Sequence, residues 1–342
     1  MPFTDERPWV IRDRFGPVSG SRGRFAPSPT GPLHLGNART ALLAWLAARS
    51  TGSSFVMRIE DLDGPRVRPG LESRILEELA WLGIDWDEGP DVGGPFGPYR
   101  QSERRERYDA ALATLRARRA VYPCFCSRAE IAAATQAPHG PGDDGPRYPG
   151  TCRGLGAAEV ASRRARRPPA WRFRVPGGPV AFDDAVHGRC AFDVCAAVGD
   201  FVVSRADGVA AYQLAVVVDD AAMAIEEVVR GEDLLSSTAR QVLLYRALDL
   251  SLPRFVHVPL VVGEDGTRLA KRHGALSLGE LRARGAHPGD VVGLLAALSG
   301  LRPAAQRTGP RELVREFSLR PVPPTPAVLR PEMIGACLPV NR

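Results

Sequence analysis

Apolar positions in the first third of the chain alternate between strand-like and helix-like spacing. We expect strands at 22–27 and 54–59, and helices at 37–49 and 71–82. In the first helix, Leu42, Trp45 and Leu46 follow the spacing of one buried face. Gly83 ends the second helix. Strands and helices that alternate in this order predict an α/β fold with a doubly wound parallel sheet.

The pattern changes in the middle of the chain and then returns to strands and helices. The expected elements are a basic helix at 103–120, an amphipathic strand at 171–175, further strands at 214–218, 225–229 and 256–262, and a helix from about Ser237. Leu214 to Val218 is a continuous apolar run before two aspartates, which is typical of a strand buried on both faces. The segment 116–190 interrupts the alternation, and we interpret it as an insertion into the sheet domain.

Length and charge narrow the class of protein. The chain has 342 residues, enough for two or three packed units. Its net charge of +6 and its pI near 9.3 indicate an anionic partner, of which RNA is one. No apolar stretch is long enough to span a bilayer, and residues 1–21 lack an apolar signal core. We therefore expect a cytoplasmic monomer with a flexible N-terminal extension and no membrane partner.

The segment from Pro27 to Asn37 places a turn rich in proline and glycine directly before a helix. His34 and Asn37 lie where this helix begins, so backbone N–H groups and the helix dipole favour a phosphate there. His34 can also donate a hydrogen bond to phosphate oxygens as charge develops on them. Taken alone, the segment is equally well interpreted as a proline-rich turn with a helix-capping histidine.

A second candidate segment runs from Arg268 to Arg272. Lys271 follows a strand and the turn Gly263–Gly266, so it can swing and supply positive charge to a departing pyrophosphate. The simple alternative is a solvated basic loop. The two segments fall on the two predicted halves of one parallel sheet. Their occurrence together indicates an enzyme that holds ATP and promotes attack on its α-phosphorus.

Three cysteines and a tyrosine have the spacing of a metal site. Cys124 and Cys126 form Cys-x-Cys, and Tyr148 and Cys152 form Tyr-x3-Cys. Three thiolates and a phenolate could hold a structural zinc ion in tetrahedral geometry. The alternative is three buried thiols packed against a tyrosine, and His139 could replace Tyr148 as a ligand. The stretch 138–147 between the pairs is rich in proline and glycine and is expected to loop out.

The two candidate segments resemble the two signature motifs of the class I aminoacyl-tRNA synthetases. Segments that further resemble the glutamate-specific branch are Arg24–Asn37, Arg58–Asp63, Gly199–Phe201, Tyr212–Asp220 and Val229–Leu234. Only 71 residues follow Lys271, whereas an anticodon-reading domain would need roughly 100–150. The chain is therefore similar to the truncated branch of this family, the glutamyl-Q tRNA(Asp) synthetases. It departs from the usual second motif at Arg268 and Ala270, where Lys and Ser are common.

The resemblance implies a reaction and a set of site residues. Glutamate would be activated with ATP and Mg²⁺, and then transferred to the cyclopentenediol of queuosine at the wobble position of tRNA(Asp). The implied residues are His34 and Lys271 for catalysis; His34, Gly36, Asn37, Arg268, Leu269 and Lys271 for ATP; Arg24, Phe25, Ala26, Pro27, Ser28, Glu60, Tyr212 and Arg230 for glutamate; and Cys124, Cys126, Tyr148 and Cys152 for Zn²⁺. Physical chemistry agrees, because a guanidinium grips a carboxylate in a fork and a carboxylate accepts from an ammonium group.

The resemblance also implies an organisation in five parts. These are the extension at 1–21, the first half of a Rossmann-like nucleotide-binding domain at 22–115, the inserted zinc-containing subdomain at 116–190, the second half at 191–255, and at 256–342 a mobile lysine loop with a short helical region and no anticodon-binding domain. Arginines at 153, 163–167, 172 and 174 could contact RNA phosphates, although a solvated basic face is equally plausible.

Three other functions remain open from the sequence. One is a short glutamyl-tRNA synthetase that charges the 3′ end of tRNA(Glu). Another is a nucleotidyltransferase that shares only the sheet and the His34 motif, against which the segment Arg58–Asp61 and the cysteine cluster argue. The third is a catalytically silent zinc and RNA-binding protein, which would be favoured if His34 or Lys271 were missing.

Overall fold

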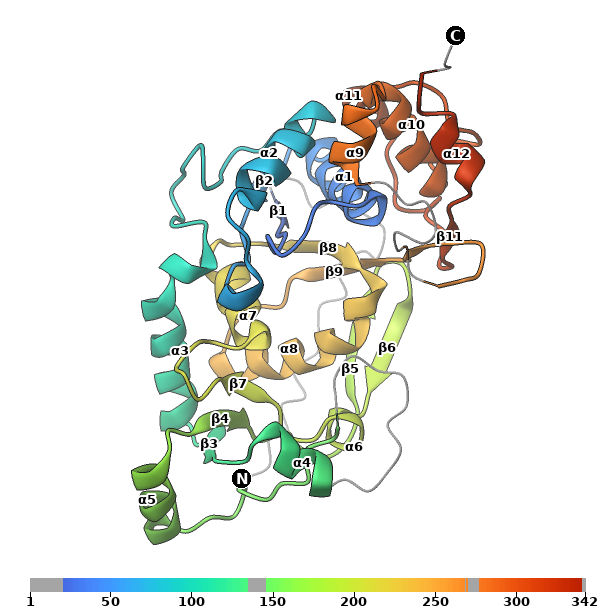
Figure 1. Ribbon diagram of the computed structural model, residues 1–342. Helices are drawn as coiled ribbons and strands as arrows, with labels where there is room; N and C mark the ends of the chain where they lie inside the picture. Colours follow the sequence, from blue (N-terminus) through green and yellow to red (C-terminus); the bar gives the residue numbers. More distant parts are fainter. Residues whose placement is uncertain (1–20, 135–145, 268, 270–276, 340–342) are drawn as a thin grey trace.

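A six-stranded sheet forms the centre of the computed structural model, which describes residues 21–134, 146–267, 269 and 277–339 (Figure 1). In spatial order its strands are β2 (Ser54–Met57), β1 (Arg22–Phe25), β8 (Glu227–Gly231), β9 (Arg254–Val258), β5 (Val180–Asp184) and β6 (Gly188–Phe192). All neighbours are parallel except β5 and β6, which pair antiparallel. The doubly wound sheet is therefore mixed, not wholly parallel as predicted.

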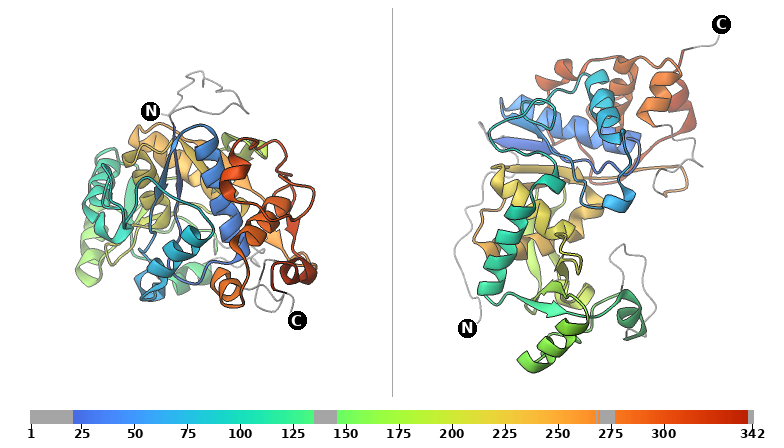
Figure 2. Two further views of the ribbon diagram at one scale, coloured as in Figure 1. Left: turned by 90° about the horizontal axis from the view of Figure 1, so that it is seen from above. Right: turned by 60° about the vertical axis from the view of Figure 1, so that its left-hand side comes forward.

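Helices cover both faces of this sheet. The described helices are α1 (Leu35–Ser50), α2 (Leu71–Trp81), α3 (Arg105–Ala117), α4 (Arg128–Ala134), α5 (Ala157–Arg166), α6 (Val194–Ala197), α7 (Tyr212–Ala222), α8 (Leu235–Leu248), α9 (Leu278–Ala283), α10 (Pro288–Leu298), α11 (Pro310–Val314) and α12 (Pro331–Gly335). Helix α1 packs on β1 and β8, with α10 and α11 behind it, and α8 packs on β5 beside α7 and α3 (Figure 1). The two helical layers lie on opposite sides of the sheet, as the side view in Figure 2 shows.

The apolar run Leu214–Val218 forms a helix, and the prediction of a strand there is wrong. The run lies within α7, and all of its residues are buried. A continuous apolar run has the same pattern in a buried strand and in a buried helix, so periodicity does not separate them. Asp219 lies at the buried end of this run and accepts from Arg104 Nε at 2.6 Å and Tyr108 OH at 2.8 Å.

A smaller antiparallel sheet lies below the main sheet in Figure 1. It consists of β3 (Val121–Cys124), β4 (Ala170–Phe173) and β7 (Val202–Ser204), with α4, α5 and α6 around it. Strands β5 and β6 also begin within the predicted insertion 116–190, but β5 pairs with β9 in the main sheet. The five-part division stays a prediction, and the structure shows that this stretch contributes strands to both sheets.

The C-terminal part of the described chain packs against the core of the main sheet. Pro259 and Leu260 separate β9 from β10 (Val261–Val262), so the single strand predicted at 256–262 is two strands. Strand β10 pairs with β11 (Ala327–Val328). Leucines of α10 share one apolar core with those of α1. None of the helices in the described ranges has the length and apolar composition needed to cross a membrane.

Candidate functional site

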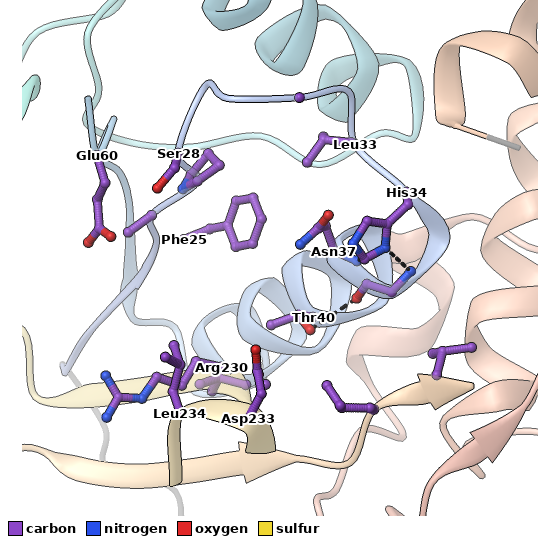
Figure 3. Close-up of a pocket in the computed structure, with 18 of the residues that line it drawn as sticks. Phe25, Ser28, Leu33, His34, Asn37, Thr40, Glu60, Arg230, Asp233 and Leu234 are labelled. Carbon is purple, nitrogen blue, oxygen red and sulfur yellow. Dashed lines mark hydrogen bonds between the residues drawn. The ribbon is translucent and has the colours of Figure 1, made fainter. Parts of the chain in front are cut away.

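A cavity of about 650 Å³ opens at the carboxyl ends of β1, β8 and β9 (Figure 3). The chain leaves β1 toward β2 and leaves β8 toward β9 in the opposite direction, and ligands bind at such a switch point in open α/β sheets. The predicted site residues that line the cavity are Arg24, Phe25, Ala26, Pro27, Ser28, His34, Gly36, Asn37, Glu60, Tyr212, Arg230 and Leu269. Arg268 and Lys271 lie outside the described residues.

His34 caps the start of α1. Its Nδ1 accepts from the backbone N–H groups of Gly36 and Asn37, at 3.1 and 3.3 Å. Because Nδ1 is an acceptor, the proton of the neutral ring is on Nε2. A side chain at Gly36 would lie 3.0 Å from the His34 ring, so glycine suits this cap. The alternative of a helix-capping His34, left open by the sequence, is thus observed, and two of the N–H groups expected to face a phosphate are occupied by its Nδ1. The donor of the ring is Nε2.

Four charged side chains form a buried network beside β1 and β2. Asp220 Oδ1 accepts from Arg58 Nη1 at 2.7 Å and lies 3.4 Å from Arg24 Nε. Arg58 Nη2 donates to Glu60 Oε1 at 3.0 Å. Burial alone would raise the pKa of Asp220, but the charges of Arg58 and Arg24 outweigh it and lower that pKa. The network fixes Arg24 and Glu60 relative to one another, since both are tied to the Arg58–Asp220 pair.

Arg230 is the charged residue on β8 that lines the cavity, and it is 5% exposed. Its Nη2 donates to Thr238 Oγ1 and Gln241 Oε1, both at 2.7 Å. Its Nε donates to His257 Nε2 at 3.0 Å. No described residue accepts a hydrogen bond from the buried Nη1. The three acceptors are neutral groups, so the positive charge of this guanidinium has no hydrogen-bonded carboxylate, and one of its donors has no acceptor among the described residues.

His257 and Asp184 stand behind Arg230 and are fully buried. His257 Nδ1 lies 2.7 Å from Asp184 Oδ2, and the backbone N–H of His257 donates to the same oxygen at 3.0 Å. Burial lowers the pKa of His257 to about 4, although the hydrogen bond to Asp184 acts in the opposite direction. His257 is therefore neutral at pH 7. A ring proton on Nδ1 satisfies Asp184, which leaves Nε2 to accept from Arg230.

Several cavity residues were not predicted from the sequence. Thr40 and Asp233 line the cavity, and Figure 3 shows both near the first turns of α1. Tyr212, by contrast, was among the predicted residues. It begins α7 and is 36% exposed, so it lies at the mouth of the cavity. The one available signal for Arg58 was its place in the glutamate-type segment. His257 and Asp184 lie in ordinary strands, and their spacing gives no signal.

The cysteine cluster is assembled as predicted. The Sγ atoms of Cys124, Cys126 and Cys152 all lie within 4.8 Å of one another, and the last two are 3.6 Å apart. Tyr148 OH lies 3.4 Å from Cys124 Sγ and 3.9 Å from Cys126 Sγ. A tetrahedral zinc ion with Zn–S bonds of about 2.3 Å separates its sulfur ligands by about 3.8 Å. The donor set and its spacing therefore suit a zinc ion.

The arginines predicted for RNA contact are not one exposed surface. Arg172 is buried, with Nε 3.3 Å from Cys124 Sγ and its guanidinium 3.8 Å from the centre of the Tyr148 ring. The prediction that it could face phosphates is wrong, because it packs against the cysteine cluster. Arg164 and Arg166 on α5 are exposed, and α5 buries none of its residues.

Comparisons with known proteins extend over most of the chain. The family model for class I tRNA synthetases (E and Q), catalytic domain, matches residues 21–315. The chain is 55% identical to a glutamyl-Q tRNA(Asp) synthetase of Symbiobacterium thermophilum, over 92% of this chain and 97% of that protein. It is 49% identical to the protein of the same name in Nitratidesulfovibrio vulgaris, over 90% and 95%. The expected resemblance is confirmed.

Longer relatives match over a smaller share of their length. A glutamate–tRNA ligase of Heliobacterium modesticaldum is 47% identical over 90% of this chain but only 62% of its own. Among solved structures, a glutamate tRNA ligase from Elizabethkingia meningosepticum, in complex with its amino acid, has a TM-score of 0.82 and 32% identity. That match covers 92% of this chain and 68% of the other. The cavity and the sheet thus lie in the part shared with these proteins.

Proposed function

The chain belongs to the catalytic-domain family of the class I tRNA synthetases (E and Q), and from this premise we propose that it activates L-glutamate with ATP. Its enzyme class is that of an aminoacyl-tRNA synthetase-type ligase. We further propose that the glutamyl group is transferred to the queuosine base of tRNA(Asp). The observation that carries the proposal is the buried Arg230, which lines a cavity together with Glu60 and His34 and whose Nη1 has no hydrogen-bond acceptor among the described residues.

The proposed amino-acid subsite lies between Arg230 and Glu60 (Figure 3). A buried guanidinium with neutral partners gains most from an anionic ligand, so Arg230 favours a carboxylate of glutamate over the neutral amide of glutamine. Glu60 would accept from the α-ammonium group of the substrate. Arg24, held by Asp220 and by the Val229 carbonyl oxygen at 3.0 Å, adds positive charge beside it.

The proposed activation step is an in-line attack on ATP. An oxygen of the glutamate α-carboxylate forms a bond to the α-phosphorus, and the bond to the leaving pyrophosphate breaks, giving glutamyl-adenylate. His34 Nε2 would donate to the phosphate oxygens as charge develops, and Lys271 is predicted to do the same at the pyrophosphate. Mg²⁺ bound with ATP would offset the phosphate charge. Positioning and electrostatics supply the rate, so the step needs no protein nucleophile.

The proposed transfer step moves the glutamyl group from AMP to a hydroxyl of the queuosine cyclopentenediol. Support comes from the two relatives named glutamyl-Q tRNA(Asp) synthetase, to which the chain is 55% and 49% identical over 92% and 90% of its residues. The second candidate is transfer to the 3′ end of tRNA(Glu), which the 47% identity to a glutamate–tRNA ligase favours.

We also propose that Cys124, Cys126, Tyr148 and Cys152 hold a structural zinc ion. Their donor atoms have suitable spacing and chemistry, and the site joins β3 to the segment after residue 146. When bound, the ion would supply cross-links between these segments. It has no part in the proposed chemistry.

The test is glutamate-dependent exchange of labelled pyrophosphate into ATP, followed by charging of tRNA. We expect exchange with glutamate but not with glutamine, and labelled glutamate on queuosine-containing tRNA(Asp) but not on the same tRNA lacking queuosine. The second candidate would be favoured if the protein charges tRNA(Glu) and if periodate oxidation of the 3′ end of that tRNA prevents the charging. No exchange with glutamate, with or without tRNA, would contradict activation altogether.

A further inference from the structure

Three residues on adjacent strands of the main sheet form a buried chain of hydrogen bonds. Arg230 on β8 is directly opposite His257 on β9, and Asp184 ends the next strand, β5. Arg230 Nε donates to His257 Nε2 at 3.0 Å, and His257 Nδ1 lies 2.7 Å from Asp184 Oδ2. Of the three, Arg230 alone lines the cavity. The other two therefore act on a ligand through Arg230.

The carboxylate of Asp184 determines which nitrogen of His257 carries the proton. Asp184 Oδ1 accepts from the backbone N–H groups of Val186 and His187 at 3.0 and 2.9 Å. Its Oδ2 accepts from the backbone N–H of His257 and faces Nδ1. An ionised carboxylate is an acceptor only, so the ring proton must lie on Nδ1. His257 Nε2 then has a lone pair directed at Arg230, which is a donor only.

This tautomer determines the orientation of the Arg230 guanidinium. Its Nε and Nη2 are held by His257, Thr238 and Gln241, which leaves Nη1 as the atom without a partner among the described residues. Gln241 is itself oriented, because its Nε2 donates to Gln213 Oε1 at 3.0 Å. If the proton moved to His257 Nε2, that N–H could donate to Thr238 Oγ1, which lies 3.0 Å away, but Arg230 Nε would lose its acceptor and two N–H donors would oppose one another. We therefore expect the guanidinium to shift.

We propose that Asp184 and His257 are positioning residues, which hold Arg230 with Nη1 directed at the carboxylate of the amino-acid substrate. This inference rests on the proposed function for the identity of the ligand. Its physical basis is pre-organisation: a guanidinium already held in place loses less entropy when the carboxylate binds. The affinity for the amino acid, but not for the nucleotide, therefore depends on the tautomer of His257, which Asp184 sets from a strand two positions away from that of Arg230.

The main test compares His257→Leu with His257→Gln in pyrophosphate exchange by the full chain. Leucine removes the acceptor, whereas the side-chain oxygen of glutamine reaches the position of Nε2 and can accept from Arg230. We expect His257→Leu to raise the KM for glutamate roughly 10- to 100-fold without changing the KM for ATP, and His257→Gln to restore most of the loss. Tyr122→Phe, which removes a buried 2.6 Å hydrogen bond to Asp200 in the smaller sheet, is the matched control.

Asp184→Asn gives a second measurement that does not depend on leucine being tolerated. The amide oxygen would accept from Val186 and His187, and the NH₂ group would then face His257 Nδ1 and shift the ring proton to Nε2. The backbone N–H of His257 would lose its acceptor in this variant, so its unfolding free energy is measured beside the KM. Nitrogen NMR of labelled histidine should show the Nδ1–H tautomer in the unchanged protein and the Nε2–H tautomer in Asp184→Asn, together with a raised KM for glutamate.

Different results overturn different statements. An unchanged KM for glutamate in His257→Leu or Asp184→Asn, or equal losses for glutamate and ATP, would reduce the pair to a structural role. If the unchanged protein performs no exchange, the proposed function has failed, and the NMR result then decides the inference. The Nδ1–H tautomer supports the positioning of Arg230, and an Nε2–H tautomer in the unchanged protein overturns it.

Discussion

The residues that face the cavity depend on partners that hold them in place. Arg24 and Glu60 were predicted as ligand contacts because the resemblance to the glutamate-specific synthetases implies them, and their charges suit an amino acid. The structure adds Arg58 and Asp220, which join them through hydrogen bonds of 3.0 Å or less to Glu60 and to each other. Asp220 lies almost 200 positions from Arg24 in the chain. A sequence read residue by residue identifies the groups that touch a ligand more readily than the groups that hold them.

Substitution can separate the cap that His34 provides for α1 from its proposed role as a donor to ATP. Asparagine is a strong N-cap, so His34→Asn should keep the cap of α1 but lose the ring donor. We expect stability close to that of the unchanged protein and exchange slower by about 10²–10³-fold. His34→Ala should lose both, with an added loss of about 1 kcal/mol in unfolding free energy. Chemical denaturation and exchange kinetics measure the two effects, and an active His34→Asn variant would limit His34 to capping.

Burial of neutral His257 predicts a dependence of stability on pH. Its folded pKa, about 4, lies below the ordinary 6.5, so its contribution is complete above pH 6.5 and is lost as the pH falls toward 4. The loss over this range should be about 3 kcal/mol. His257→Gln does not titrate, so the difference between the two denaturation curves isolates this group from Glu60, whose pKa burial raises. Curves that stay parallel from pH 7 to pH 4 would contradict a buried neutral histidine.

At the scale of elements, the sequence predicted most helices and strands around the cavity correctly. Helices α1, α2, α3 and α8 lie within a few residues of the ranges predicted for them. Spacing alone does not explain this for α1 and α8, because both are buried along most of their length. Helix α7 was missed because its apolar run is buried on all sides. The antiparallel pairing of β5 with β6 and the break at Pro259 were also missed. Both depend on contacts between distant segments, which local periodicity does not contain.

The smaller sheet gives a prediction about metal. We expect the purified protein to hold one zinc ion per chain, and Cys152→Ser to lose it to a chelator that leaves the unchanged protein loaded. Removing the ion should lower the unfolding free energy by about 3–4 kcal/mol, as for a ligand well above its dissociation constant. Metal analysis and thermal unfolding measure this.

The matched control for the metal prediction is Cys190→Ser. Cys190 is a half-buried thiol on β6, outside the cluster, so its replacement should change neither the zinc content nor the response to chelator. If the unchanged protein contains no zinc and unfolds at the same temperature with and without chelator, the four residues are packed thiols and a tyrosine only.

At the scale of the whole molecule, the main sheet, which carries the cavity, and the smaller sheet lie in different regions of an elongated structure (Figure 2). The proposed site for the amino acid and ATP is the cavity alone, whereas a tRNA is large enough to contact both regions. The net charge of +6 suits such a partner. The structure divides the arginines that the sequence presented as one group, because Arg172 is buried and the arginines of α5 are not. Only the exposed arginines can neutralise phosphates of a tRNA.

Removing charge from α5 should therefore weaken tRNA binding without affecting amino-acid activation. In Arg164→Gln/Arg166→Gln, stability should change by less than about 0.5 kcal/mol, because α5 buries no residue. The slope of log affinity against log salt should become shallower by about 0.7–0.9 for each phosphate that no longer meets an arginine. Arg311→Gln/Arg315→Gln removes equal charge from α11 and from the residue directly after it, and should leave the slope unchanged. Helix α11 lies at the opposite end of the molecule from α5 (Figure 1). Equal slopes in all three proteins would place the tRNA elsewhere, since counterion release depends on which charges the phosphates meet.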